Sequence, residues 1–168
     1  AYILLLSGGS DFAVGLAMSL QALGSAITPM LSASLVGHRT RVLPVGFWTG
    51  GAMRVCVLGL ALAGFFLPTP QALIAVIVSL ALFGVFAGMK TVIFQVLLSK
   101  VIPVANRGKL TGLRNFLAGI TTALVAWFGG NYLLGSPPTA GGYAWLFLIA
   151  FVLTSTGLLF LALVREPQ

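Results

Sequence analysis

The sequence predicts an all-α fold, a polytopic helix bundle that lies in a membrane. Hydrophobic residues make up 59% of the chain, charged residues make up only 7%, and the mean hydropathy is +1.10. A soluble globular domain carries about 25% charged residues, so this chain has too few of them to cover a surface that faces water. We therefore expect an integral membrane protein whose main partner is the lipid bilayer.

Five segments are long enough to cross that bilayer, because a spanning helix needs about 20 mostly apolar residues. The segments are 11–36, 42–67, 72–101, 109–134 and 143–164. Clusters that contain proline, and in the last two cases also glycine, separate the later segments, namely "LPTPQ" (67–71), "VIPVANRGK" (101–109) and "GSPPTAGG" (135–142). Proline cannot donate a helical hydrogen bond and glycine destabilises a helix, so these clusters are expected to end the helices.

The first and last residues extend beyond these spans. The opening stretch "AYILLL" is too short to cross a bilayer, and it does not have the pattern of a cleaved signal peptide. We interpret it as the stump of an earlier helix and the chain as a fragment, truncated within its first helix. Residues 165–168 are expected to begin a cytoplasmic linker.

The distribution of lysine and arginine predicts the orientation. Basic residues gather at alternate connections, at Arg39 and Arg41, at Lys100, Arg107 and Lys109, and at Arg165. The other connections, 7–11, 67–71 and 135–142, contain none. Because short basic loops remain in the cytoplasm, we expect 38–41, 102–108 and the C-terminus to face the inside of a cell (inner) membrane. The net charge of +7 forms no basic stripe, so no nucleic-acid partner is expected.

Three further cations lie within the predicted spans. Arg114 is only about 8 Å along the helix from Lys109, and its side chain is expected to extend to the cytoplasmic surface. Arg54 lies about 20 Å from either end of its helix, where an arginine costs about 3 kcal/mol on insertion scales. It either faces the interior or a cavity, or, if Trp48 marks the headgroup level, extends to the surface from a depth of about 9 Å.

The third cation, Lys90, shares one helical face with Phe83, Phe86 and Phe94, at steps of three and four residues. Two interpretations remain open. The face lines a pocket of aromatic residues with one cation, or it is a packed aromatic stripe that includes an incidental lysine.

The first span carries a polar stripe, because Gln21, Ser25, Thr28 and Ser32 recur at helical spacing, with Asp11 near the same face. Such a stripe lines water or bonds to neighbouring helices. Serine and threonine can also bond to carbonyls of their own helix, so packing is the expected role of each of them. Gln21 cannot be satisfied so easily, and we expect it to face a cavity.

Glycines at four-residue spacing indicate close contacts between helices, as in Gly46 with Gly50 and Gly84 with Gly88.

The inventory of reactive side chains argues against catalysis. His38 is the only histidine, Cys56 the only cysteine, and Asp11 and Glu166 the only acids. These residues cannot form paired carboxylates, a metal cluster or a catalytic triad. We expect no enzymatic activity, no cofactor and no metal site.

The stretch "VIPVANRGKLTGLRNFLAG" (101–119) resembles the loop between helices four and five of major facilitator superfamily transporters. There a helix ends at a proline, an Arg-Gly-basic turn follows, and the next helix opens with glycine. The matching residues are Pro103, Arg107, Gly108, Lys109 and Gly112. The stretch "SASLVGHRTRVLPVG" (32–46) sits where the family has its basic loop between helices two and three, but it lacks the aspartate that precedes the basic residues and the glycine among them.

The resemblance implies the N-terminal six-helix half of a secondary active transporter, which moves a small-molecule solute by alternating access between two halves. The missing C-terminal six-helix half would then be a partner. The residues expected to bind substrate or line the cavity are Arg54, Lys90, Gln21, Ser25, Phe86 and Phe94. Cations at depth favour an anionic or carboxylate-bearing solute. The alternative is a non-transporting multi-pass subunit or scaffold, which water-accessible polar residues at mid-membrane would argue against.

Overall fold

The computed structural model describes residues 1–37, 43–101, 103–134 and 138–162. Its elements, in chain order, are α1 (Tyr2–Leu6), α2 (Asp11–Gly37), α3 (Leu43–Phe66), α4 (Thr69–Val101), α5 (Val104–Phe128), a π-helix η1 (Gly129–Leu133) and α6 (Ala140–Ala162). The five long helices, α2 to α6, are each apolar enough to cross a membrane by length and composition. Within the described residues, the predicted all-α membrane bundle is therefore confirmed.

Three helices begin earlier than the sequence predicted. Helix α5 starts at Val104 and not at 109, α6 starts at Ala140 and not at 143, and α4 starts at Thr69 and not at 72. Pro103 explains the first difference, because it is the N-cap of α5 with φ −55° and ψ 143°. Proline is well tolerated at a helix start, where its missing N–H would have no helical partner. The predicted loop 102–108 is consequently reduced to the short break between α4 and α5.

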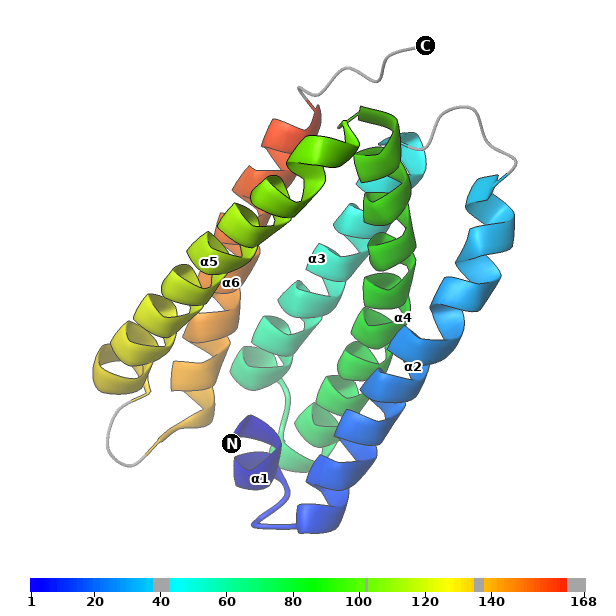
Figure 1. Cartoon of the computed structure of the whole chain (residues 1–168). Coiled ribbons are helices and arrows are strands. Elements are labelled where there is room, and N and C mark those ends of the chain that lie inside the picture. The colour runs from blue at the N-terminus through cyan, green and yellow to red at the C-terminus, as the bar shows by residue number, and fades with distance from the viewer. Residues whose placement is uncertain (38–42, 102, 135–137, 163–168) are drawn as a thin grey trace.

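The long helices run up and down between the two ends of the bundle (Figure 1). The end of α2, the start of α3, the α4–α5 break and the end of α6 lie at one end, which is the upper end in Figure 1. The α1–α2, α3–α4 and η1–α6 connections lie at the other. Arg107 and Lys109 are at the upper end with the start of α5, whereas Arg39, Arg41 and the predicted linker 165–168 fall outside the described residues.

Helix α4 is the centre of the packing, with α2 against one side of it and α3 packed against both α4 and α6. The α2–α4 contact is close because its glycines have no side chain. A Cβ added to Gly88 would lie 2.9 Å from the carbonyl oxygen of Ser25 and 3.1 Å from Cβ of Thr28. The close contact predicted from Gly84 and Gly88 is thus confirmed.

The short helix α1 fills the lower end of the bundle. Tyr2, Ile3 and Leu6 are buried in an apolar cluster with residues of α2, α3 and α4. The ring of Tyr2 stacks on that of Tyr143 in α6, with 5.1 Å between the centroids. The turn that leads from α1 into α2 requires glycine, because Gly8 has a φ of +67° and the next residue, also a glycine, one of +95°.

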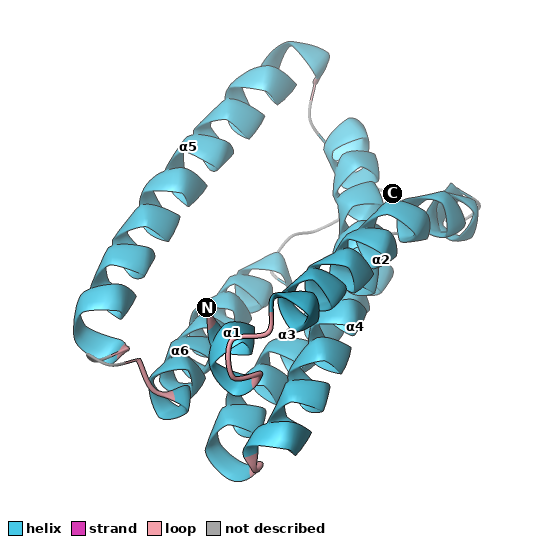
Figure 2. Cartoon of the chain, turned by 90° about the horizontal axis from the view of Figure 1, so that it is seen from below, coloured by secondary structure: helices cyan, strands magenta, loops and turns pink. Residues whose placement is uncertain are grey.

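Helix α5 stands apart from the other long helices, as Figure 2 shows from below. None of its residues, all of which the structure describes, is buried. Its two ends are nevertheless attached. At the upper end, Nη2 of Arg107 donates a hydrogen bond of 2.8 Å to the carbonyl of Ser99 in α4. At the lower end, Gly129 is buried so closely against Leu146 of α6 that an added Cβ would lie 2.8 Å from a leucine methyl.

Candidate functional site

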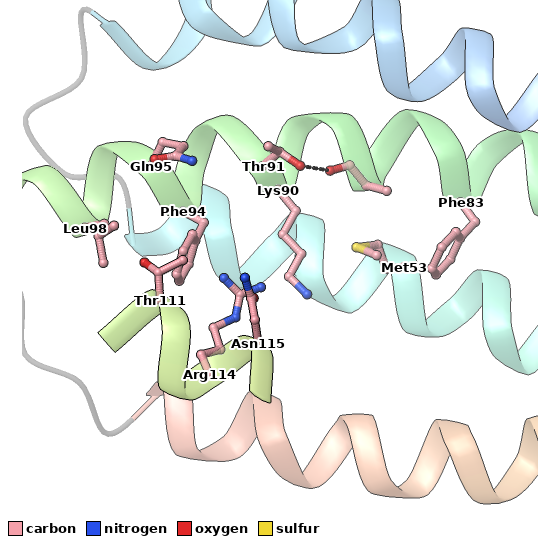
Figure 3. Close-up of a pocket in the computed structure, with 11 residues that line it drawn as sticks. Met53, Phe83, Lys90, Thr91, Phe94, Gln95, Leu98, Thr111, Arg114 and Asn115 are labelled. Atoms are coloured by element: carbon pink, nitrogen blue, oxygen red, sulfur yellow. Dashed lines mark hydrogen bonds between the residues drawn. The ribbon is translucent and has the colours of Figure 1, made fainter. Parts of the chain in front are cut away.

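A cavity of about 480 Å³ lies where α5 faces α4, with Met53 of α3 in its wall (Figure 3). Helix α4 contributes Phe83, Lys90 and Phe94, among others, and α5 contributes residues between 111 and 115. The α4 residues follow one another at steps of three and four, so they occupy one face of the helix. The cavity is therefore built from the helix face that carries Lys90.

Two cations from different helices line this cavity. The guanidinium carbon of Arg114 lies 4.2 Å from the centroid of the Phe94 ring, the geometry of a cation–π contact. The Lys90 side chain is exposed and projects from α4 toward the same space (Figure 3). It makes no hydrogen bond or ion pair with any residue that the structure describes.

Arg54, Lys90 and Arg114 form what we call the cation layer. Arg54 follows the start of α3 by eleven residues, Lys90 precedes the end of α4 by eleven, and Arg114 follows the start of α5 by ten. All three helix ends lie at the upper end of the bundle (Figure 1). At 1.5 Å per residue, each Cα is therefore about 15 to 17 Å from that end, so the three residues lie at about the same depth.

Arg54 belongs to this layer but not to the cavity wall. Its Nε donates a 2.8 Å hydrogen bond to the carbonyl of Thr154 in α6, and its Nη2 donates to the same oxygen. Its Nη1 donates at 2.5 Å to the carbonyl of Gly50, one turn earlier in α3. The half-buried guanidinium is thus held at the α3–α6 contact by backbone carbonyls.

The other predicted residues separate into two groups. Lys90 and Phe94 come together in the cavity, whereas Gln21, Ser25 and Phe86 are not part of its wall. Phe86 packs edge-on against Trp48, with 6.2 Å between the ring centroids. The Ser25 hydroxyl donates a 2.9 Å hydrogen bond to the carbonyl of Ala22. Gln21 is half-buried on α2, with its backbone carbonyl against Gly84.

The rest of the polar stripe on α2 serves packing. Thr28 and Ser32 are buried, and their hydroxyls donate to carbonyls of their own helix, at 2.5 Å to Gly24 and at 3.2 Å to Pro29. Such local bonds satisfy the hydroxyls without a ligand or water. The expected packing role of these two residues is therefore confirmed.

The residues of the loop motif lie at the α4–α5 break and not in the cavity wall. Pro103 opens α5, and Arg107 bonds to Ser99. Gly108 and Gly112 have open space where a Cβ would lie, and Lys109 is exposed on the same helix. In the described part of the chain, the motif thus forms the end of the α4–α5 pair.

Sequence reasoning missed the contribution of α5 to the cavity. Arg114 was expected to extend to the cytoplasmic surface, and this is wrong, because α5 begins at Val104 and places Arg114 about 15 Å along it. Its guanidinium stacks on Phe94 instead. Thr111 and Asn115 line the cavity beside it. Thr111 precedes Arg114 by three residues and Asn115 by four. This spacing was visible in the sequence and could have identified this face.

The wall also includes neutral polar groups, the side chains of Thr91 and Gln95 on α4. No acid is near. Asp11 is the only acid among the residues that the structure describes. It opens α2 at the lower end of the bundle, whereas the cation layer lies closer to the upper end (Figure 1). A cavity with two cations, several hydrogen-bonding groups and no carboxylate is suited to an anion.

Comparison with known protein families gives one assignment. The model described as Major Facilitator Superfamily matches residues 2–168. The match includes the α4–α5 motif and every residue of the cation layer. No curated protein and no solved structure matches the chain significantly.

Proposed function

This chain belongs to the major facilitator superfamily, and we propose that it is part of a secondary active transporter for a small anionic or carboxylate-bearing solute. The transporter works by alternating access, and the solute site lies near mid-membrane between two halves, of which this chain is the N-terminal one. The upper end of the bundle faces the cytoplasm, and the membrane is the inner membrane of the cell.

One observation carries the anionic solute. Lys90 and Arg114 reach one cavity from two helices, with Arg54 at about the same depth on α3 and no acid among the described residues of the wall. Each cation at such a depth is unfavourable by about 3 kcal/mol on insertion scales, and the like charges repel one another. An anion bound between Lys90 and Arg114 relieves both effects. Anion binding therefore accounts for the presence of the two cations at this depth.

The two cavity cations have different roles in this proposal. Lys90 is a compact charge with three donors and no partner among the described residues, so it contacts the anionic group first. Arg114 is held over Phe94, and its planar fork can give bidentate hydrogen bonds to a carboxylate. Asn115 supplies a neutral donor beside it. Arg54 remains bonded to Thr154 and contributes a fixed positive charge.

The attachment of α5 supports alternating access. This helix is tethered at Arg107 and at Gly129 and has no buried residue between them. We propose that its middle moves relative to α4 as the solute binds and leaves. The C-terminal half would supply the opposite wall.

Matched pairs of solutes test the proposal directly. The complete transporter, purified in detergent, is heated with a panel of small carboxylates and with their neutral amides. At least one carboxylate should raise the unfolding midpoint, and its amide should not. The stabilisation should be lost in Lys90→Gln and retained in Lys109→Gln, which removes an exposed lysine outside the cavity. Equal stabilisation by acid and amide, or an unchanged response in Lys90→Gln, would contradict the proposal and favour a scaffold.

A further inference from the structure

We propose that the solute is an amphipathic organic anion, with one carboxylate-like head at Lys90 and a ring-sized apolar body against Phe83 and Met53. This inference rests on the proposed function and specifies its substrate class. It follows from the way in which polar and apolar groups are sorted along the cavity.

The sorting is visible along the axis of α4 (Figure 3). Arg114, Asn115 and Thr111 lie on the side of Lys90 toward Leu98, and Met53 and Phe83 lie on the opposite side. Phe83 precedes Lys90 by seven residues, which is about 10 Å along the helix. A head bound at Lys90 that extends toward Phe83 therefore needs a body about as long as one aromatic ring and its substituent.

The two phenylalanines of the wall are not equivalent. The face of Phe94 is already covered by the guanidinium of Arg114, so it has little apolar surface to offer a solute. Phe83 has no such partner among the described residues and is only half-buried. Beside it, Met53 presents a flexible, polarizable thioether that adapts to irregular apolar shapes. The free aromatic surface is thus at the end of the cavity away from Arg114.

A small inorganic anion would use only part of this site. It would satisfy Lys90 and Arg114 but leave Phe83, Met53 and Ala87 in contact with water. An apolar body removes that surface from water, which is favourable in proportion to the area covered. The cavity volume of about 480 Å³ also lies in the range typical of sites for organic ligands.

Three anions separate these possibilities: benzoate, acetate and inorganic phosphate, titrated against the complete transporter. Benzoate should bind at least about tenfold more tightly than acetate, the effect of covering one ring with apolar surface. Phe83→Ala should remove this preference by weakening benzoate binding far more than acetate binding, and the milder Phe83→Leu should retain part of it. Phe86→Ala is the matched control, because Phe86 is on the same helix but packs against Trp48 outside the cavity.

The outcomes distinguish the inference from the function on which it rests. Phosphate or acetate binding as tightly as benzoate would overturn the apolar body while leaving an anion site in place. An undiminished benzoate preference in Phe83→Ala would do the same. If none of the three anions binds and the carboxylate panel gives no stabilisation, the proposed function fails and the inference fails with it.

Discussion

The guanidinium of Arg54 joins α3 to α6 through the backbone of Thr154, with its Nε 2.8 Å from that carbonyl oxygen. A second donor, Nη2, bonds to the same oxygen. The hydroxyl of Thr154 meanwhile donates at 2.7 Å to the carbonyl of Ala150 in its own helix. A cation within a membrane helix is therefore stabilised by carbonyl dipoles of the protein, one of the arrangements by which intramembrane charges are tolerated.

Replacement of Arg54 should show both a packing and a functional effect. Arg54→Gln loses the paired donation to Thr154, and interhelical hydrogen bonds in membranes contribute about 0.6 to 2 kcal/mol, so the unfolding midpoint should fall by a few degrees. Solute uptake should fall much further than the amount of folded protein, because a positive charge is also lost from the cation layer. Arg54→Lys should recover only part of both, because lysine lacks the planar fork. An Arg54→Leu protein with normal stability and uptake would show that neither role exists.

The contact between Arg114 and Phe94 should be measurable as a coupling energy. We expect Arg114→Gln and Phe94→Leu each to destabilise the protein, and the double variant to be less destabilised than their sum by about 0.5 to 2 kcal/mol. The measurement is a double-mutant cycle on the free energy of unfolding in detergent. Strictly additive effects would indicate that the guanidinium does not interact with the ring in solution.

The α2–α4 contact predicts a sharp difference between two glycines. Gly88→Ala should destabilise the protein, because the new Cβ would lie 2.9 Å from the Ser25 carbonyl oxygen, and backbone must shift to accommodate it. Gly119→Ala is the control, since its Cβ would enter open space and alanine favours a helix by up to about 1 kcal/mol. Thermal unfolding of both variants tests this. Equal midpoints would mean that α2 and α4 are not packed as closely as described.

The orientation in the membrane can be tested with single cysteines in a Cys56→Ala background. Ser136→Cys lies in a connection without basic residues, and Asn106→Cys lies beside Arg107 at the exposed start of α5. Because short basic segments stay in the cytoplasm, an impermeant thiol reagent should label position 136 from outside intact cells and position 106 only after the membrane is opened. The reverse pattern would invert the topology.

The helices could be predicted because apolar runs of sufficient length, separated by proline and glycine, leave few alternatives in a membrane. The start of α5 was misplaced because Pro103 was interpreted as part of a loop, although it begins the helix. Lys90 and Phe94 were found together because one helix carries both. Phe86 shares their approximate spacing, but it is about 80° around the axis from Phe94 at 100° per residue. This angle turns it toward Trp48.

The α5 side of the cavity is a tertiary feature. Arg114, Thr111 and Asn115 meet Lys90 only because α5 runs beside the face of α4 that carries it. Similarly, nothing local to Arg54 indicates a bond to Thr154, which is one hundred residues away in the sequence. Spacing along one helix can propose a polar face, but only the packing of helices shows which faces meet.

The most direct test of the central claim is the accessibility of position 90 in the complete transporter. In a Cys56→Ala background, Lys90→Cys is treated with a membrane-impermeant, positively charged thiol reagent or with a neutral reagent of similar size. We predict that the cysteine is labelled, that the attached positive charge restores part of the carboxylate stabilisation and of the lost uptake, and that the neutral adduct restores neither. A cysteine at this position that stays unlabelled, or a charged adduct that responds to the carboxylate no better than the neutral one, would contradict an anion-binding cavity at Lys90.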